Sequence, residues 1–88
     1  AIILDVRTPM EWSDGIIEGA LLIDIMGGRF VDEIEALDKD KTYYLMCRSG
    51  NRSQTACAVM YQRGFKDVSN VMGGMIDWQG KVVQQNLK

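Results

Sequence analysis

The sequence predicts an α/β domain in which helices cover both faces of a small central parallel sheet, giving three layers. Short apolar segments rich in β-branched residues alternate with segments of helical periodicity along the whole chain. The connections between these segments are brief, which is typical of parallel strands joined by crossover helices. The 88 residues are 47% apolar and 25% charged, so we expect a single domain with one core over residues 1–88.

The chain opens with the pattern of a buried strand followed by a short helix. The run "IILDV" is apolar and β-branched, and it predicts a strand over residues 2–6. In "TPMEWSDG", Thr8 is suited to the N-cap of a helix and Pro9 to its first helical position. Gly15 is suited to end this helix, which we therefore expect within residues 8–15.

The middle of the chain repeats the alternation of strand and helix. The run "ALLIDI" predicts a strand over residues 20–25, and apolar residues at helical spacing predict a helix over residues 29–40. The run "TYYLMC" predicts a third strand over residues 42–47. We expect the next helix over residues 53–64, where Gly64 is suited to the C-terminal cap.

The last quarter of the chain predicts a strand, a turn and a helix. The run "DVSNV" predicts a fourth strand over residues 67–71, and the glycine pair at 73–74 predicts a turn. The run "MIDWQGKVVQQNLK" favours a final helix over residues 75–88, although Gly80 within it is unfavourable to helix. Ligands of parallel α/β sheets gather at the carboxyl ends of the strands, so we expect a pocket where the 42–47 strand ends.

Charge is unevenly distributed along the chain. The formal net charge is −2, which argues against non-specific binding of nucleic acid. Residues 1–38 carry two basic and nine acidic side chains, whereas residues 39–88 carry eight basic and three acidic ones. This polarity is compatible with a small anionic substrate, and equally with ordinary surface variation. No apolar run approaches the length that crosses a bilayer, so we expect no contact with a membrane.

The chain has two cysteines, Cys47 and Cys57, and no histidine. The lack of histidine excludes a Cys–His protease, a Ser–His–Asp hydrolase and a His-ligated metal centre within this chain. Two thiols do not complete a closed zinc site, so we expect neither a metal nor another cofactor. A disulfide between the cysteines is disfavoured, because we expect Cys57 inside a helix.

The segment "CRSGNRS" places Cys47 at the point where a strand meets a helix. Such a loop exposes unpaired backbone N–H groups, and a positive φ at Gly50 would let them converge on an anion. Arg48 and Arg52 add two cations beside the helix N-terminus. These features predict that the pKa of the Cys47 thiol is below its ordinary value, which would make it a nucleophile. The alternative is a small buried hydrophobe, the interpretation that we prefer for Cys57.

Three motifs, taken in order, resemble the rhodanese homology domain, and the similarity extends over essentially the whole chain. The segment "LDVRTPMEWSDGIIEGA" is similar to the opening strand, acidic-aromatic helix and Gly-Ala turn of that family. The segment "YYLMCRSGNRSQTA" is similar to its active-site strand and loop, with the form Cys-x-x-Gly-x-Arg. The segment "RGFKDVSNVMGGMIDW" is similar to its closing strand, Gly-Gly turn and tryptophan.

The resemblance implies a sulfurtransferase with a rhodanese-like fold. In this mechanism a small anionic donor such as thiosulfate forms a persulfide on the loop cysteine, which by position is Cys47. The outer sulfur then passes to a thiophilic acceptor such as cyanide or a thiol. Arg52 would close the loop, and Asp5 and Arg7 would hold the scaffold together. The residues that would bind the substrate are Arg48, Ser49, Gly50, Asn51, Arg52 and Ser53.

The chain departs from the family pattern in two places. Ile16 and Glu18 stand where the family often has histidine and proline, so we expect no help from a histidine near the pocket. Family members also usually carry a short strand and helix before the first motif, so we expect a trimmed domain or a bare sheet edge. We expect Trp12, Trp78 and the methionines in the core, and a cytoplasmic location, or a periplasmic one if a leader was removed.

Three other functions remain open. Loops that contain a cysteine and a closing arginine also occur in phosphatases and arsenate reductases. In the phosphatase type of loop, five residues separate the cysteine from the arginine, whereas four residues separate Cys47 from Arg52. The shorter loop suits a single sulfur atom better than a tetrahedral anion. The other two functions are a non-catalytic binding or regulatory module, and a persulfide relay with the thiol of a partner protein, which would use the same residues.

Overall fold

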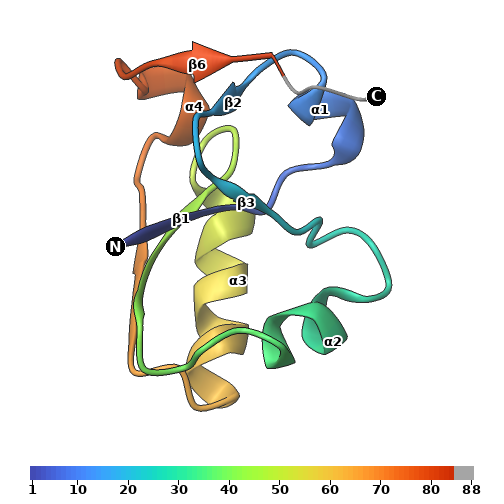
Figure 1. Ribbon diagram of the computed structural model, residues 1–88, viewed down its shortest axis with the longest axis vertical. Coiled ribbons are helices and arrows are strands. Elements are labelled where there is room, and N and C mark those ends of the chain that lie inside the picture. The colour runs from blue at the N-terminus through green and yellow to red at the C-terminus, as the bar shows by residue number, and fades with distance from the viewer. Residues whose placement is uncertain (85–88) are drawn as a thin grey trace.

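The computed structural model describes residues 1–84 and has the predicted α/β class with a central parallel sheet (Figure 1). The strands are β1 (Ile2–Asp5), β2 (Ile16–Ile17), β3 (Leu21–Leu22), β4 (Thr42–Met46), β5 (Asp67–Asn70) and β6 (Val82–Val83). The helices are α1 (Pro9–Trp12), α2 (Phe30–Glu35), α3 (Asn51–Gln62) and α4 (Gly74–Asp77). Within this part of the chain the parallel sheet has the order β3-β1-β4-β5, and β2 pairs with β6 in antiparallel fashion.

The register of the parallel sheet decides which side chains face the helices. Leu4 of β1 lies beside Leu45 of β4, which in turn lies beside Asn70 of β5. Side chains at paired positions point to the same face of a sheet, so these three share one face. Leu4 and Leu45 belong to a buried apolar cluster that includes residues of α2 and α3. Both helices therefore cover this face of the sheet, which carries the main core (Figure 1).

The opposite face of the sheet is covered less completely. Asp5 and Met46 are buried on it near the carboxyl ends of their strands, whereas Tyr44 is 41% exposed. Figure 1 shows α1, α4 and the β2–β6 pair together at the end of the molecule where β4 leads into α3. These short elements therefore cover the end of the sheet at which a ligand is expected.

The start of α1 confirms the capping prediction. Thr8 is the N-cap, its side chain accepts a hydrogen bond from the backbone N–H of Glu11, and Pro9 is the first helical residue. The Glu11 carboxylate accepts a hydrogen bond from the backbone N–H of Thr8, which completes a capping box. These contacts stabilise a helix of four residues that would be marginal alone.

Two helix boundaries differ from those expected. α3 begins at Asn51 rather than at Ser53, so Arg52 and Ser53 belong to its first turn instead of the preceding loop. The shift follows from Gly50, whose φ of 99° makes the turn into the helix immediately after it. α2 covers only Phe30–Glu35 of the expected 29–40, and its last buried residue is Ile34.

The prediction of a final helix over residues 75–88 is wrong for the described part of it. α4 ends at Asp77, and Trp78 has an extended backbone with φ −69° and ψ 126°. Val82 and Val83 then pair with Ile17 and Ile16, because β-branched side chains favour a strand that has a partner. Residues 85–88 of the expected helix lie outside the described residues.

The expected burial of tryptophans and methionines is only partly correct. Trp12 is buried, as are two methionines, Met46 and Met60. By contrast Met10, Met26 and Met72 are exposed, which corrects the expectation for these three. Within residues 1–84, no helix has both the length and the apolar character needed to span a bilayer.

Candidate active site

The Cys47 thiol lies at the carboxyl end of β4, directly before α3. We call residues 47–50 the Cys47 loop. Cys47 is 1% exposed, and its Sγ accepts hydrogen bonds from the backbone N–H of Gly50 at 3.0 Å and the hydroxyl of Ser53 at 3.3 Å. Gly50 has the predicted positive φ, which turns the backbone back toward the sulfur. The sulfur is thus surrounded by donors although water scarcely reaches it.

The pKa of Cys47 reflects two opposing influences. Burial is the largest single influence, and it raises the pKa because a thiolate is poorly solvated in the interior. Hydrogen bonds from the Ser53 side chain and from the backbone N–H groups of Ser53, Gly50 and Ser49 lower it, and together they outweigh burial. The pKa of Cys47 is therefore below its ordinary value, as predicted, which favours the nucleophilic thiolate.

Cys57 has the opposite environment. It is buried in α3 within the main apolar cluster, and burial raises the pKa of its thiol. Both cysteines are free. The structure thus confirms the expected core position of Cys57 and leaves Cys47 as the cysteine with an activated thiol.

Helix α4 explains why the N–H groups of the Cys47 loop face the sulfur. The backbone N–H groups of Met75 and Ile76 donate to the carbonyl oxygens of Cys47 at 2.9 Å and Arg48 at 3.0 Å. Since the carbonyls of the loop are bound by α4, its N–H groups remain available on the other side. A Cβ at Gly74 would lie 2.3 Å from the Cys47 oxygen, so this close approach requires glycine. The glycine pair is recognisable as a turn from the sequence, but this role of Gly74 is not.

Arg52 closes the site by pairing with α1. Its Nη1 and Nη2 donate to Oε1 and Oε2 of Glu11 at 2.6 and 2.7 Å. The hydrogen bonds from Arg52 are the largest influence on Glu11 and lower the pKa of its carboxyl to about 2. Arg52 is thus the expected cation in the first turn of α3, and its charge is paired with the Glu11 carboxylate. Glu11 was not among the predicted site residues, although its spacing of three residues from Thr8 is a capping-box signal.

Asp5 and Arg7 have the expected position in the scaffold. Arg7 Nη2 lies 2.8 Å from Asp5 Oδ2, and both side chains are buried. The same nitrogen donates to the backbone oxygen of Gly15 at 2.8 Å, and Nη1 donates to that of Glu11 at 3.4 Å. The buried pair thus joins the end of β1 to the C-terminal part of α1 and the turn that follows it.

The predicted substrate-binding residues do not share one environment in the structure. Arg48 is exposed and borders a cavity of about 310 Å³ beside α4, whereas Ser49, Gly50 and Asn51 border another of about 110 Å³. Arg52 is bound to Glu11, and Ser53 is fully buried against Cys47. The six residues therefore do not line one cavity.

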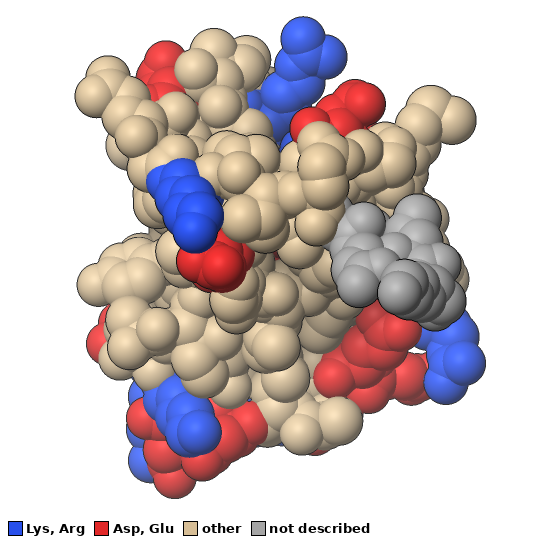
Figure 2. Space-filling view, turned by 45° about the horizontal axis from the view of Figure 1, so that its top comes forward, with Lys and Arg blue, Asp and Glu red and all other residues tan. Residues whose placement is uncertain are grey.

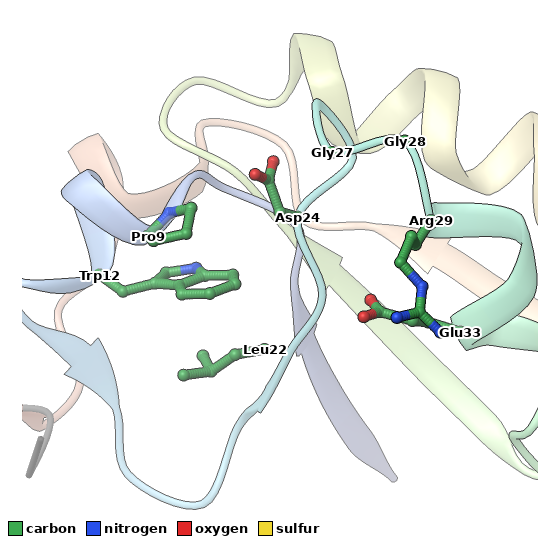
Figure 3. Close-up of a pocket in the computed structure, with 8 residues that line it drawn as sticks. All are labelled: Pro9, Trp12, Leu22, Asp24, Gly27, Gly28, Arg29 and Glu33. Carbon is green, nitrogen blue, oxygen red and sulfur yellow. The ribbon is translucent and has the colours of Figure 1, made fainter. Parts of the chain in front are cut away.

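A further cavity, of about 420 Å³, lies away from the predicted loop residues (Figure 3). Trp12 lies across it between Pro9 and Leu22, and Arg29 and Glu33 lie on the opposite side (Figure 3). None of residues 47–53 lines it, so Cys47 is not part of this cavity. We therefore assign the candidate site to Cys47 and its hydrogen-bond donors.

The fold brings the acidic and basic halves of the chain together. Basic and acidic side chains adjoin on the face that Figure 2 shows. Within the described residues, the ion pairs that join 1–38 to 39–84 are Glu11–Arg52, Glu18–Lys81, Glu35–Lys39 and Glu35–Arg63. Among residues 1–84, no group of three or more His, Cys, Asp or Glu side chains is placed to hold a metal ion.

The class of protein is defined by the match to a protein family. The model of the rhodanese-like domain matches residues 1–81, which is nearly the whole chain. A rhodanese-like domain protein from Staphylococcus aureus has the same fold, with a TM-score of 0.87 and 31% identity. The match covers 98% of this chain and 82% of that one. The chain therefore belongs to the family of rhodanese-like domains.

Relatives in this family support a sulfurtransferase class. The protein YtwF of Bacillus subtilis is 42% identical over 84 residues, which cover 96% of this chain and 79% of YtwF. The thiosulfate sulfurtransferase GlpE of Pseudomonas paraeruginosa is 38% identical over 79 residues, covering 90% of this chain and 70% of GlpE. These similarities support sulfur transfer in general and leave the donor and acceptor to be assigned.

Proposed function

We propose that this protein carries a sulfane sulfur as a persulfide on Cys47, taking it from thiosulfate or another persulfide donor. The acceptor would be cyanide, a small thiol or the thiol of a partner protein. One observation carries the proposal: a buried Sγ receives hydrogen bonds from Gly50 and Ser53, and its pKa lies below the ordinary value. The similarity to GlpE, which is named for thiosulfate, supports the choice of donor.

The reaction has two steps that need no histidine. The Cys47 thiolate attacks the outer sulfur of thiosulfate, the sulfur–sulfur bond of thiosulfate breaks, and sulfite leaves with the electron pair. The acceptor then attacks the outer sulfur of the persulfide, and the electron pair of the broken bond returns to Sγ as a thiolate. With cyanide the product is thiocyanate, so charge balances in each step.

The Cys47 loop would stabilise the charge in both steps. A persulfide carries its negative charge on the outer sulfur, which backbone N–H groups of the loop are suited to receive. The exposed Arg48 would attract the anionic donor at the edge of the site. Because the N–H groups are held by the α4 contacts, they need no rearrangement when the charge moves.

The decisive test is intact mass spectrometry after brief exposure to thiosulfate. We expect a gain of one sulfur atom, which cyanide or a reducing thiol removes with release of the unmodified protein. Cys47→Ser should abolish the gain. Cys57→Ser should retain it, because burial keeps that thiol protonated and out of the reaction.

Two results would contradict the proposal. One is a Cys57→Ser protein that gains no sulfur although it is folded, since this would mean that both thiols take part. The other is hydrolysis of an aryl phosphate without any sulfur gain from thiosulfate, which would favour a phosphatase.

A further inference from the structure

Asn70, the last residue of β5, contacts both the Cys47 loop and Ser53. Its Nδ2 donates to the backbone oxygen of Gly50 at 3.0 Å, and its Oδ1 accepts a hydrogen bond from the Ser53 hydroxyl. Asn70 lies beside Leu45 in the sheet, on the face that α3 covers, which brings it within reach of Ser53. Neither step described above assigns it a role.

The Ser53 hydroxyl has one hydrogen and two acceptors within reach. One acceptor is Sγ of Cys47, and the other is Oδ1 of Asn70. A hydroxyl donates to a single acceptor at a time. The orientation of the Asn70 amide is determined by Gly50, because Nδ2 is needed as the donor to the Gly50 carbonyl. Oδ1 therefore always faces Ser53 as an acceptor.

We propose that Asn70 is a positioning residue for sulfur transfer. It keeps the Ser53 hydroxyl beside Sγ of Cys47, and it accepts the hydrogen bond of that hydroxyl while Sγ carries the outer sulfur. This rests on the proposed persulfide. When the acceptor attacks the outer sulfur, the bond between the two sulfur atoms breaks and its electron pair goes to Sγ. The hydroxyl then turns from Asn70 to the new thiolate, and Ser53 keeps its proton throughout.

The loss of Asn70 should therefore act through Ser53. Serine hydroxyls within helices commonly bond to a carbonyl of the preceding turn when nothing else holds them. Without Asn70 we expect the Ser53 hydroxyl to turn away from Sγ, which would then lose its side-chain donor. The charged groups near Cys47 stay unchanged in the variants below; they are Arg48, the pair Arg52–Glu11 and the pair Arg7–Asp5.

The test uses Asn70→Leu, Ser53→Ala and the double variant, each on a Cys57→Ser background so that a single thiol is titrated. The first readout is the pH dependence of alkylation by iodoacetamide, and the second is the rate at which preformed persulfide passes to cyanide. Each single variant should raise the pKa of Cys47 and slow alkylation at neutral pH about tenfold, as expected for loss of a hydrogen bond to a charged group. The double variant should match Ser53→Ala alone.

Ser69→Ala is the matched control. Ser69 precedes Asn70 on β5 and is exposed on the opposite face, so its replacement should leave both rates at the wild-type value. Asn70→Ala gives a second series, with the same expectation, should the leucine variant fail to fold as judged by circular dichroism.

Three results would overturn the proposal: additive effects in the double variant, an unchanged rate in the Asn70 variants, or faster alkylation in them. Faster alkylation would mean that Asn70 merely competes with Sγ for the hydroxyl. Alkylation requires no sulfur donor. A protein that shows the expected alkylation pattern but gains no sulfur from thiosulfate would therefore contradict the proposed function, and would leave only the effect of Asn70 on the Cys47 thiolate.

Discussion

At the residue scale, Cys47 combines two features that normally exclude one another. It is almost completely buried, which opposes ionisation, and yet its pKa lies below the ordinary value. The compensation comes from neutral donors at short range, chiefly the Ser53 side chain and the backbone N–H groups around it. Such donors are worth more in a poorly solvated site than in water, because water does not compete for the thiolate.

Glu11 contributes to the site without touching the sulfur. Its carboxylate both completes the capping box of α1 and binds the guanidinium of Arg52 in the first turn of α3. This single side chain therefore joins two elements that are far apart in the sequence. Its pKa of about 2 shows that the folded protein favours the ionised form.

The pairing of Glu11 predicts a specific loss of stability in acid. The folded pKa is lowered to about 2 from an ordinary value of 4.5, so the stabilisation is complete above pH 4.5 and is lost as the pH falls toward 2. Glu11→Gln should lower the free energy of unfolding by about 1 kcal/mol at pH 6, since solvent screens a pair that is partly exposed. Urea denaturation at several pH values should show this difference shrinking to nearly zero at the acid end.

Glu33→Gln is a suitable control for this measurement. Within residues 1–84 the Glu33 carboxylate forms no ion pair, so its replacement should change the unfolding free energy little. A Glu11→Gln difference that stayed constant with pH would show that the salt bridge is not the source of the stabilisation.

At the element scale, the Cys47 loop depends on its contact with α4. A helix of four residues has little stability of its own, but its first N–H groups are the donors that bind the loop carbonyls. The arrangement stabilises both partners, because α4 gains acceptors and the loop gains a defined orientation. Gly74 permits it, with a positive φ and no side chain at the point of contact.

Gly74→Ala should therefore damage the site as well as the fold. The added methyl group would overlap the backbone at Cys47 and Arg48, and the positive φ adds strain, for a total cost of about 2 kcal/mol or more. We expect a lower urea midpoint and slower alkylation of Cys47. Gly28→Ala is the control, since nothing lies within 4 Å of a Cβ there and its stability should stay near wild type. If Gly74→Ala and Gly28→Ala had the same urea midpoint and the same alkylation rate, the contact between α4 and the Cys47 loop would not be what stabilises the site.

At the scale of the whole molecule, the fold cancels part of the charge polarity of the sequence. Four ion pairs connect the acidic first part of the chain to the basic remainder within the described residues. Opposite charges that lie close together produce little field at a distance. The attraction of an anionic donor should therefore be local, and Arg48 is the exposed cation of the Cys47 loop.

This cancellation predicts that sulfur loading depends only weakly on salt. Raising the ionic strength from about 0.01 M to about 1 M shortens the screening length from about 30 Å to about 3 Å. The rate of persulfide formation with thiosulfate should fall by less than about tenfold, whereas a strongly steered reaction would fall much further. Arg48→Gln should lower the rate at low salt and remove most of the remaining dependence, as measured by stopped-flow loading. A steep decline that Arg48→Gln left unchanged would mean that the whole surface attracts the donor.

Much of the fold was predictable because the relevant signals are local. The α/β class, the strands of the parallel sheet, the cap at Thr8 and the positive φ at Gly50 follow from side-chain patterning within a few residues. The final helix was not predictable, since Val82 and Val83 form a strand only because Ile16 and Ile17 offer them a partner. A short segment with mixed propensity adopts the structure that its neighbours in space allow.

For the candidate site, the proposed nucleophile and the loop around it could be inferred from the sequence alone. Both depend on adjacent residues between Cys47 and Ser53, and the chemistry of these residues can be inferred from their types and order alone. Their surroundings depend on the folded arrangement, in which Glu11 binds Arg52, α4 binds the loop carbonyls and Asn70 binds Ser53. These contacts join residues from separate strands and helices, and hydrogen bonds between distant segments depend on geometry that no local pattern encodes.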